Sequence, residues 1–196
     1  MRCLYLLTAM EGRTEVDRWG FRLADIRMTL ERNTGAVTPG KGVRPARDAD
    51  IPALAAIARE SHTDSRFYAD PGFPRERCDA LYQTWIEKSC RGYAKAVLVA
   101  EQDGRPAGYI TCDWSEDVGH IGLVAVAGWA RGAGLGRELV NASVDLFLRG
   151  ELRRVSVVTQ GRNVSAQRLY QRCGFLTASV QLWYHRWFPG LCDGPL

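Results

Sequence analysis

An apolar stretch, an arginine and three glycines follow one another near the middle of the chain in an order that suits anion binding. Ile121 to Ala127 has the length and composition of a buried strand, and Leu135 to Arg149 repeats apolar residues at helical spacing. Glycines in the turn between them let the backbone approach a ligand closely. Because the free N–H groups at a helix N-terminus favour a phosphate, the sequence predicts an anion site in this turn.

The spacing of the glycines narrows the kind of phosphate site. A dinucleotide-binding turn requires G-x-G-x-x-G. Here the sequence is Gly132-Ala-Gly134-Leu-Gly136-Arg137, so the third glycine comes one position too early. A P-loop would end in Gly-Lys-Ser or Gly-Lys-Thr, and this turn does not. The pattern is R-x-x-G-x-G, starting at Arg131. A tight strand-to-helix connection that tolerates glycine is the alternative explanation for the turn alone.

A second segment, Asn163 to Phe175, reads N-x-x-A-x-x-L-Y-x-x-x-G-F. Asn163 is a suitable helix N-cap, and Tyr170 falls on the apolar stripe of the helix that follows. Tyr170 is therefore either a packed core residue or a functional phenol. A phenol, with a pKa of about 10, can protonate a departing thiolate, whose conjugate acid has a pKa of about 8.5, without ionising first.

Together, the two segments resemble the signatures of the GNAT family of N-acetyltransferases. The resemblance implies an α/β (α+β) fold with a mixed central sheet flanked by helices, acetyl-CoA as cosubstrate and no metal. It implies that Tyr170 is the general acid and that main-chain groups of the central strand hold the pantetheine arm and polarise the thioester carbonyl. The cofactor-binding residues expected on this basis are Leu123, Val124, Ala125, Val126, Arg131, Gly132, Ala133, Gly134, Leu135, Gly136, Arg137, Asn163 and Tyr170.

The rest of the chain predicts the order β–α–α–β–β–β–α–β–α–β. Gly150 is expected to be the C′ residue of the helix over Leu135 to Arg149. Asp103-Gly104 between apolar runs predicts a hairpin. Asp50 is expected to cap the first helix, and Arg75 to Cys90 is expected to be the second. The remaining predicted elements are strands over Ala96 to Glu101, Ala107 to Asp113, Val155 to Thr159 and Thr177 to Tyr184. The second helix is expected to point Cys78, Leu81, Tyr82, Trp85 and Ile86 inward.

The N-terminal segment predicts strands at Cys3 to Leu7 and Ala24 to Leu30, on either side of Trp19-Gly20-Phe21. The order strand, helix, x-Gly-Phe, strand recurs near Gly174, which indicates a weak internal repeat. We therefore expect residues 1–40 to be a partial GNAT-like segment with a linker, 41–190 the acetyltransferase domain and 191–196 a tail. One branch of the family has a longer N-terminal half, so a truncated start is an open alternative.

Composition restricts the partners and the compartment. The net charge of +4 comes with no polybasic run, which argues against nucleic acid. The six cysteines are scattered, without C-x-x-C or pairing with histidine, which argues against zinc and for a reducing compartment. No apolar run approaches the roughly 18 residues of a membrane span. We expect a cytoplasmic protein.

Most of the chain also resembles one branch of the family, the dTDP-fucosamine acetyltransferases. The resemblance rests on peptides along the chain, including DIPAL, SRFYADP, GYIT and WYHRW. It implies that a small-molecule amine is acetylated, here the 4-amino group of a dTDP-linked 4-amino-4,6-dideoxyhexose. The residues expected on the acceptor side are Arg66, Phe67, Tyr68, Trp85 and His120.

Several alternatives stay open at this point. The proton acceptor is either His120, one of the nearby carboxylates or a chain of water molecules. These carboxylates are Glu101, Asp113, Glu116 and Asp117. The amine could instead belong to a protein N-terminus, a polyamine or an antibiotic, and a third class is a coenzyme A-binding protein without turnover. A homodimer is also left open.

Overall fold

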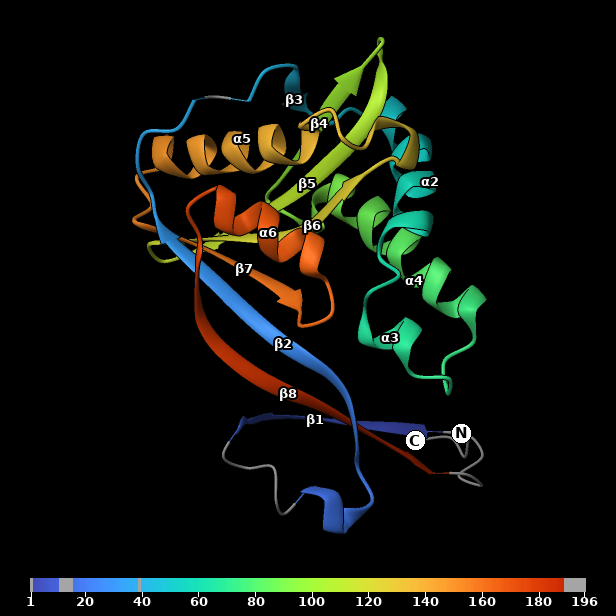
Figure 1. The fold of residues 1–196 in the computed structure, drawn as a ribbon. Coiled ribbons are helices and arrows are strands. Elements are labelled where there is room, and N and C mark those ends of the chain that lie inside the picture. Colours follow the sequence, from blue (N-terminus) through green and yellow to red (C-terminus); the bar gives the residue numbers. More distant parts are fainter. Residues whose placement is uncertain (1, 11–15, 39, 189–196) are drawn as a thin grey trace.

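The computed structural model describes residues 2–10, 16–38 and 40–188, and these form an eight-stranded mixed sheet with helices on both faces (Figure 1). The strand order is β1-β8-β2-β7-β6-β5-β4-β3. The strands are β1 (Arg2–Ala9), β2 (Arg22–Asn33), β3 (Val43–Pro45), β4 (Ala96–Gln102), β5 (Arg105–Ser115), β6 (Val118–Val126), β7 (Arg154–Gln160) and β8 (Leu176–Phe188). The helices are α2 (Ile51–Ser61), α3 (Arg66–Ala69), α4 (Arg75–Lys88), α5 (Leu135–Arg149) and α6 (Val164–Arg172), with short turns η2 (Asp17–Trp19), η3 (Asp48–Asp50), η4 (Ser89–Tyr93) and η5 (Gly128–Ala130).

The two N-terminal strands join the sheet on either side of β8. Strand β2 is antiparallel to both β7 and β8, and β1 is antiparallel to β8 along its whole length. Figure 1 shows β2 and β8 running on beyond the helices to β1. A small apolar cluster of Val16, Leu182 and Tyr184, with Phe21 against it, supports this end of the sheet.

The segment Asn33 to Arg47 is rich in Gly, Thr, Lys and Pro, a composition that predicts a linker, but it contains a strand. Val43 to Pro45 form β3, which pairs antiparallel with β4 at the sheet edge. Three residues ending in proline give no periodic pattern, so the sequence offers no signal for this strand. The predicted tail, 191–196, lies outside the described residues.

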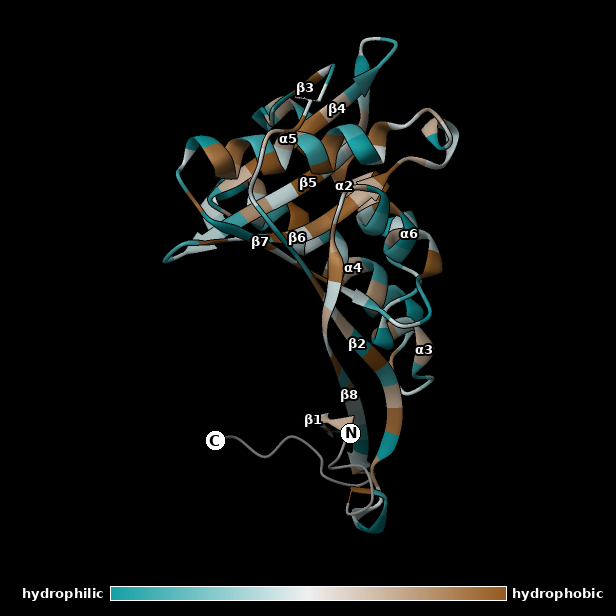
Figure 2. Ribbon diagram, turned by 60° about the vertical axis from the view of Figure 1, so that its left-hand side comes forward, coloured by the Kyte–Doolittle hydropathy of each residue, from teal (hydrophilic) through white to brown (hydrophobic). Residues whose placement is uncertain are grey.

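Apolar side chains fill both faces of the sheet. On one face Leu139, Val144 and Phe147 of α5 pack with Tyr170 of α6 against the strands. The other face carries α2 and α4, represented by Leu54 and Ile86. In Figure 2 hydrophobic and hydrophilic bands alternate along α5, as expected for a helix with one buried face.

Three local expectations are corrected. In α4, Cys78, Tyr82 and Ile86 are buried, but Leu81 and Trp85 are each 38% exposed. Gly150 ends α5 with φ −82°, and the left-handed conformation falls on Glu151 at φ 58°. Gly150 is thus the C-cap of α5, and Glu151 occupies the C′ position at which the glycine was expected.

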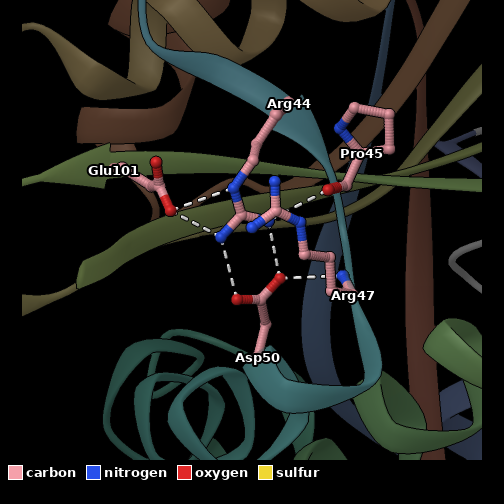
Figure 3. Close-up of polar contacts among 5 residues, drawn as sticks. All are labelled: Arg44, Pro45, Arg47, Asp50 and Glu101. Atoms are coloured by element: carbon pink, nitrogen blue, oxygen red, sulfur yellow. Dashed lines mark hydrogen bonds and ion pairs between the residues drawn. The ribbon is translucent and has the colours of Figure 1, made fainter. Parts of the chain in front are cut away.

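The Asp50 side chain does not cap α2. Its carboxylate accepts hydrogen bonds from the Arg44 guanidinium at 2.7 and 2.9 Å and from the Arg47 backbone N–H at 2.8 Å (Figure 3). Arg44 also donates to Glu101 of β4. This ion-pair network therefore fixes the start of α2 against the sheet edge.

A second carboxylate joins the loop after α3 to β8. Asp70 accepts hydrogen bonds from His185 Nδ1 at 2.6 Å, Trp187 Nε1 at 2.9 Å and the Gly72 N–H at 2.9 Å. Cys3 lies close by, with ligand-type atoms of Cys3, Asp70 and His185 within 4.8 Å of one another. Strand pairing thus brings a cysteine and a histidine together that are far apart in the sequence. Within the described ranges, no helix is long and apolar enough to cross a membrane.

Candidate active site

The candidate site lies where the neighbouring strands β6 and β7 separate. They pair in parallel only from Val118↔Arg154 to Ile121↔Val157. Beyond Ile121, strand β6 continues to Val126 without a recorded partner on β7. The separation leaves a stretch of main chain on β6 that can bind a ligand.

A β-bulge coincides with the separation. Ile110 of β5 faces Val124 and Cys112 faces Ile121, so two residues of β6, Gly122 and Leu123, lie opposite Thr111 alone. The Leu123 N–H donates to the Thr111 hydroxyl at 2.8 Å. The side chain therefore replaces the main-chain acceptor that the bulge removes.

A hydrogen bond just after β6 shows which of its N–H groups face the gap. The Ala127 N–H donates to Ala107 at the start of β5, which places that N–H on the β5 side of the strand. Successive N–H groups of a strand point to opposite edges, so those of Val124 and Val126 face the gap toward β7. Both residues lie in the range expected from the sequence to hold the pantetheine arm.

The glycine-rich turn connects β6 to α5 as predicted. Gly132 and Gly134 have φ of 86° and 83°, in the left-handed region that favours glycine. A Cβ at either position would meet no atom within 4 Å, so the turn is open on its outer side. Helix α5 starts at Leu135, immediately after it. Open main chain at a helix N-terminus, beside Arg131 and Arg137, fits a pyrophosphate.

This turn and the free end of β6 border a cavity of about 810 Å³. Most of the residues expected to bind the cofactor line it, and Ala133 and Leu123 do not. The lining also contains residues that the sequence did not single out. The lining residues used below are Asp64, Val124, Val126, Arg131, Asn163 and Tyr170.

A second cavity, of about 320 Å³, continues from the first between α4 and β7. Its walls include His62, Tyr82 and Trp85 on one side and Thr159 on the other. Several residues line both cavities, which therefore meet at these positions. The shared residues are Asp64, Val124, Asn163, Ala166 and Tyr170.

Tyr170 combines burial with a position at this junction. It is 4% exposed, and its ring packs 5.9 Å from that of Phe175. Burial raises the pKa of the phenol above its ordinary value, so the hydroxyl keeps its proton at neutral pH. Tyr170 is therefore a packed core residue that also lines both cavities.

Asn163 positions the helix that carries Tyr170. Its side chain accepts a hydrogen bond from the Ala166 N–H at 3.0 Å, which confirms the predicted N-cap of α6. Since Asn163 also lines both cavities, the cap fixes one wall of the site.

Aromatic rings form one wall of the second cavity. The His62 ring stacks on Tyr82 with centroids 4.5 Å apart, and His62 Nε2 lies 2.8 Å from the Tyr109 hydroxyl. Burial lowers the pKa of His62 to about 4, so its imidazole is neutral at pH 7. Tyr82 also stacks on Trp85. Trp85 is thus the one residue of the expected acceptor set that lines a cavity.

The other members of that set lie elsewhere. The Arg66 guanidinium lies 3.9 Å from the centre of the Trp183 ring and 4.5 Å from that of Phe67, so it packs on aromatic faces away from both cavities. The Tyr68 hydroxyl donates to Asp79 at 2.5 Å. None of Arg66, Phe67 and Tyr68 borders either cavity. Arg66 instead packs on Trp183 of β8, Phe67 on Tyr5 of β1, and Tyr68 bonds to Asp79 of α4.

The expected proton acceptors also lie outside the cavities. His120 is exposed near the start of β6, with Nε2 3.1 Å from the Ser115 hydroxyl. Glu101 is paired with Arg44, and Asp113 accepts the Lys95 backbone N–H. Glu116 and Asp117 belong to the turn before β6.

Sequence analysis missed His62, Asp64, Tyr82 and Thr159 as site residues. His62 and Asp64 stand directly before SRFYADP, in the stretch Ser61 to Pro74, whose mixed aromatic and charged residues predict only a loop. Tyr82 was expected as a core residue of its helix. The one local signal was the polar tripeptide His-Thr-Asp between two predicted helices. Only the tertiary fold places these residues beside Tyr170.

The site thus combines a separated pair of parallel strands, an arginine-flanked glycine turn and a buried tyrosine at the junction of two cavities, which together fit a pyrophosphate-bearing ligand. The model of the acetyltransferase (GNAT) family matches residues 54–175, and the chain belongs to this family.

Two of the relatives carry names that refer to a polysaccharide and to dTDP-fucosamine. The chain is 31% identical over 146 residues to the spore coat polysaccharide biosynthesis protein SpsD of Bacillus subtilis, covering 74% of this chain and 50% of that protein. It is 28% identical over 171 residues to the dTDP-fucosamine acetyltransferase of Escherichia coli, covering 85% and 72%. The chain thus spans about half the length of the first relative.

The fold also matches solved structures. A GCN5-related N-acetyltransferase from Sphaerobacter thermophilus superposes with a TM-score of 0.64 at 17% identity, covering 94% of this chain and 59% of that one. At this identity the likeness supports the fold alone.

Proposed function

We propose that this protein transfers the acetyl group of acetyl-CoA to the 4-amino group of a dTDP-linked 4-amino-4,6-dideoxyhexose. The observation that carries the reaction is the position of Tyr170 at the junction of the two cavities. The larger cavity borders the glycine-rich turn and suits the coenzyme, and the smaller one suits the amine. The acceptor class draws its support from the names of the two relatives.

Each group of residues has a separate part in this proposal. Arg131 and the N–H groups at the start of α5 hold the pyrophosphate, while the Val124 and Val126 N–H groups hold the pantetheine arm. Acetyl-CoA supplies an activated thioester. The Tyr170 hydroxyl is protonated at neutral pH and donates to the sulfur that leaves.

The aromatic wall of the smaller cavity is the part that suits a sugar nucleotide. Tyr82 and Trp85 stack in parallel, with Trp85 partly exposed, so an aromatic face is open to a flat base or to the apolar face of a sugar. Thr159, Gln160 and Asn163 add hydroxyl and amide groups along the opposite wall. Such a mixture fixes the orientation of a polar ligand.

The test is thiol release from acetyl-CoA with a panel of amines. The panel contains dTDP-4-amino-4,6-dideoxygalactose, its glucose epimer, spermidine and a model peptide, and the wild type is compared with Tyr170→Phe. Turnover confined to the sugar nucleotides and reduced by about 100-fold or more in the variant supports the proposal. Turnover only with spermidine or peptide would overturn the acceptor class. Unchanged turnover in the variant would overturn the role of Tyr170.

A further inference from the structure

We infer that the Asp64 carboxylate accepts the proton that the acceptor amine must lose before it attacks the thioester. The inference rests on the proposed function, because it assigns the missing base of the same site. Its starting point is position: Asp64 lines both cavities and shares their junction with Tyr170.

Asp64 is the one carboxylate that borders either cavity among the described residues. The larger cavity otherwise carries the cations Arg131, Arg137 and Arg172. Asp25 lies near Asp64 but is 4% exposed, and its carboxylate lies 3.6 Å from Arg162. It does not reach the cavities. A base must lie within hydrogen-bond reach of the amine or one water away, which restricts the choice to the lining residues.

His62 is the obvious competitor, and its hydrogen bond excludes it. Tyr109 is fully buried, and His62 Nε2 is its hydroxyl's partner among the described residues. A buried phenol without an acceptor for its hydrogen is costly, so Tyr109 donates and Nε2 accepts. The neutral ring then carries its own hydrogen on Nδ1. His62 therefore has no free lone pair with which to take a proton.

The remaining titratable groups of the smaller cavity are Tyr82 and Tyr170. Burial raises the pKa of both phenols, so both are protonated at neutral pH and neither is a base. The amides and hydroxyls of the opposite wall do not take up protons in this range. Elimination and position thus lead to the same residue.

The proton balance with Asp64 in this role is complete. The amine arrives as an ammonium ion and passes one proton to the carboxylate, which frees the nitrogen lone pair. The nitrogen attacks the carbonyl carbon, the C–N bond forms and the C–S bond breaks. Tyr170 gives its proton to the departing thiolate, and the second proton lost by the nitrogen restores the phenol. Asp64 releases the first proton to solvent, so the products are an amide, a thiol and one proton.

The test compares Asp64→Asn with Asp64→Glu, using the amine that the wild type acetylates. At neutral pH we expect kcat/KM of Asp64→Asn to fall by about 100-fold or more, while Asp64→Glu retains part of the activity. The loss should shrink steadily as the pH rises, because more of the free amine is then already neutral. Acetyl-CoA affinity and thermal stability should stay near wild type. Asp103→Asn, which removes an exposed carboxylate in the turn between β4 and β5, outside both cavities, is the matched control.

Each outcome bears on the inference separately. A loss that does not change with pH, or one that comes with a lower Tm, makes Asp64 a structural residue and overturns it. The same pH rescue in His62→Gln but not in Asp64→Asn would assign the base to His62. Full activity in Asp64→Asn would overturn the inference while leaving the acetyltransferase reaction intact. Failure of the wild type with every amine in the panel would overturn both the proposed function and this inference.

Discussion

The Leu123 N–H donates to the Thr111 hydroxyl at 2.8 Å, directly where β6 leaves β7. The contact satisfies the N–H group that the bulge deprives of a main-chain partner. It also keeps the following residues in a register that turns the Val124 and Val126 N–H groups toward the gap. One side chain thus supports the main-chain part of the site.

Thr111→Val should therefore damage both stability and coenzyme binding. Valine has a similar shape but no acceptor, so a buried N–H loses its partner at a cost of about 1–3 kcal/mol in the free energy of unfolding. We expect a matching loss of acetyl-CoA affinity. Urea unfolding and calorimetric titration measure the two effects. Thr177→Val, at an exposed position of β8, is the control and should change neither quantity. Equal stability of Thr111→Val and the wild type would show that the hydroxyl does not support the bulge.

The burial of His62 makes a prediction about acid. Its folded-state pKa is about 4 against an ordinary value of 6.5. As the pH falls between these values, the unfolded chain binds a proton that the folded chain refuses, so stability is lost on acidification. At a pH of about 4.5 the loss from this residue amounts to roughly 2–3 kcal/mol relative to neutral pH.

His62→Gln should remove that part of the acid sensitivity. The measurement is the difference in unfolding free energy between neutral pH and a pH of about 4.5, in both proteins. The carboxylates of the chain contribute equally to the two proteins and cancel. Equal differences would mean that His62 titrates at its ordinary value. The pH dependence of unfolding would then contradict a buried neutral imidazole.

The Arg44 network of Figure 3 gives a third prediction. Asp50 is 5% exposed, and the Arg44 guanidinium beside it lowers the pKa of its carboxyl. Arg44→Met leaves a buried carboxylate without its partner, which should cost about 3 kcal/mol. The stabilisation is present at neutral pH and is lost as the pH falls through the lowered pKa of Asp50. Denaturant unfolding at neutral and acidic pH should therefore show the gap between variant and wild type narrowing in acid.

Arg18→Met, at an exposed position of η2, is the control for the lost arginine stem. Catalytic parameters should change little in Arg44→Met at temperatures where it stays folded, because the network lies away from both cavities. A variant as stable as the wild type would mean that Asp50 is solvated well enough to stand alone.

The sequence could predict the parts of the site that depend on local chemistry. Helix α5 begins and ends where expected, because Gly134 and the apolar stripe are local signals. The Asn163 cap is local too. The placement of β2 between β7 and β8, and of His62 and Asp64 beside Tyr170, depends on contacts between distant segments. A single sequence contains no pattern for such contacts. The resemblance alone placed Arg66, Phe67 and Tyr68 on the acceptor side, and they border neither cavity.

The glycine turn offers a last prediction, in which two glycines should behave differently. Gly134 has φ 83°, so Gly134→Ala forces alanine into the left-handed region at a cost of about 1 kcal/mol or more. Gly136 is inside α5, where alanine is favoured over glycine by roughly 0.5–1 kcal/mol. A Cβ there would lie 3.2 Å from the end of the Leu169 side chain, which can shift. We therefore expect Gly134→Ala to lower stability and Gly136→Ala to leave it near wild type.

Both substitutions should nevertheless weaken acetyl-CoA binding, since each alters the main chain or fills space where the pyrophosphate would approach. Thermal unfolding and titration with acetyl-CoA separate the two effects. Gly35→Ala, at a position where a Cβ meets no atom within 4 Å, is the control and should change neither. Normal acetyl-CoA affinity in Gly136→Ala, with its fold intact, would mean that the coenzyme does not approach the turn at this residue. The binding surface would then be limited to the residues before α5.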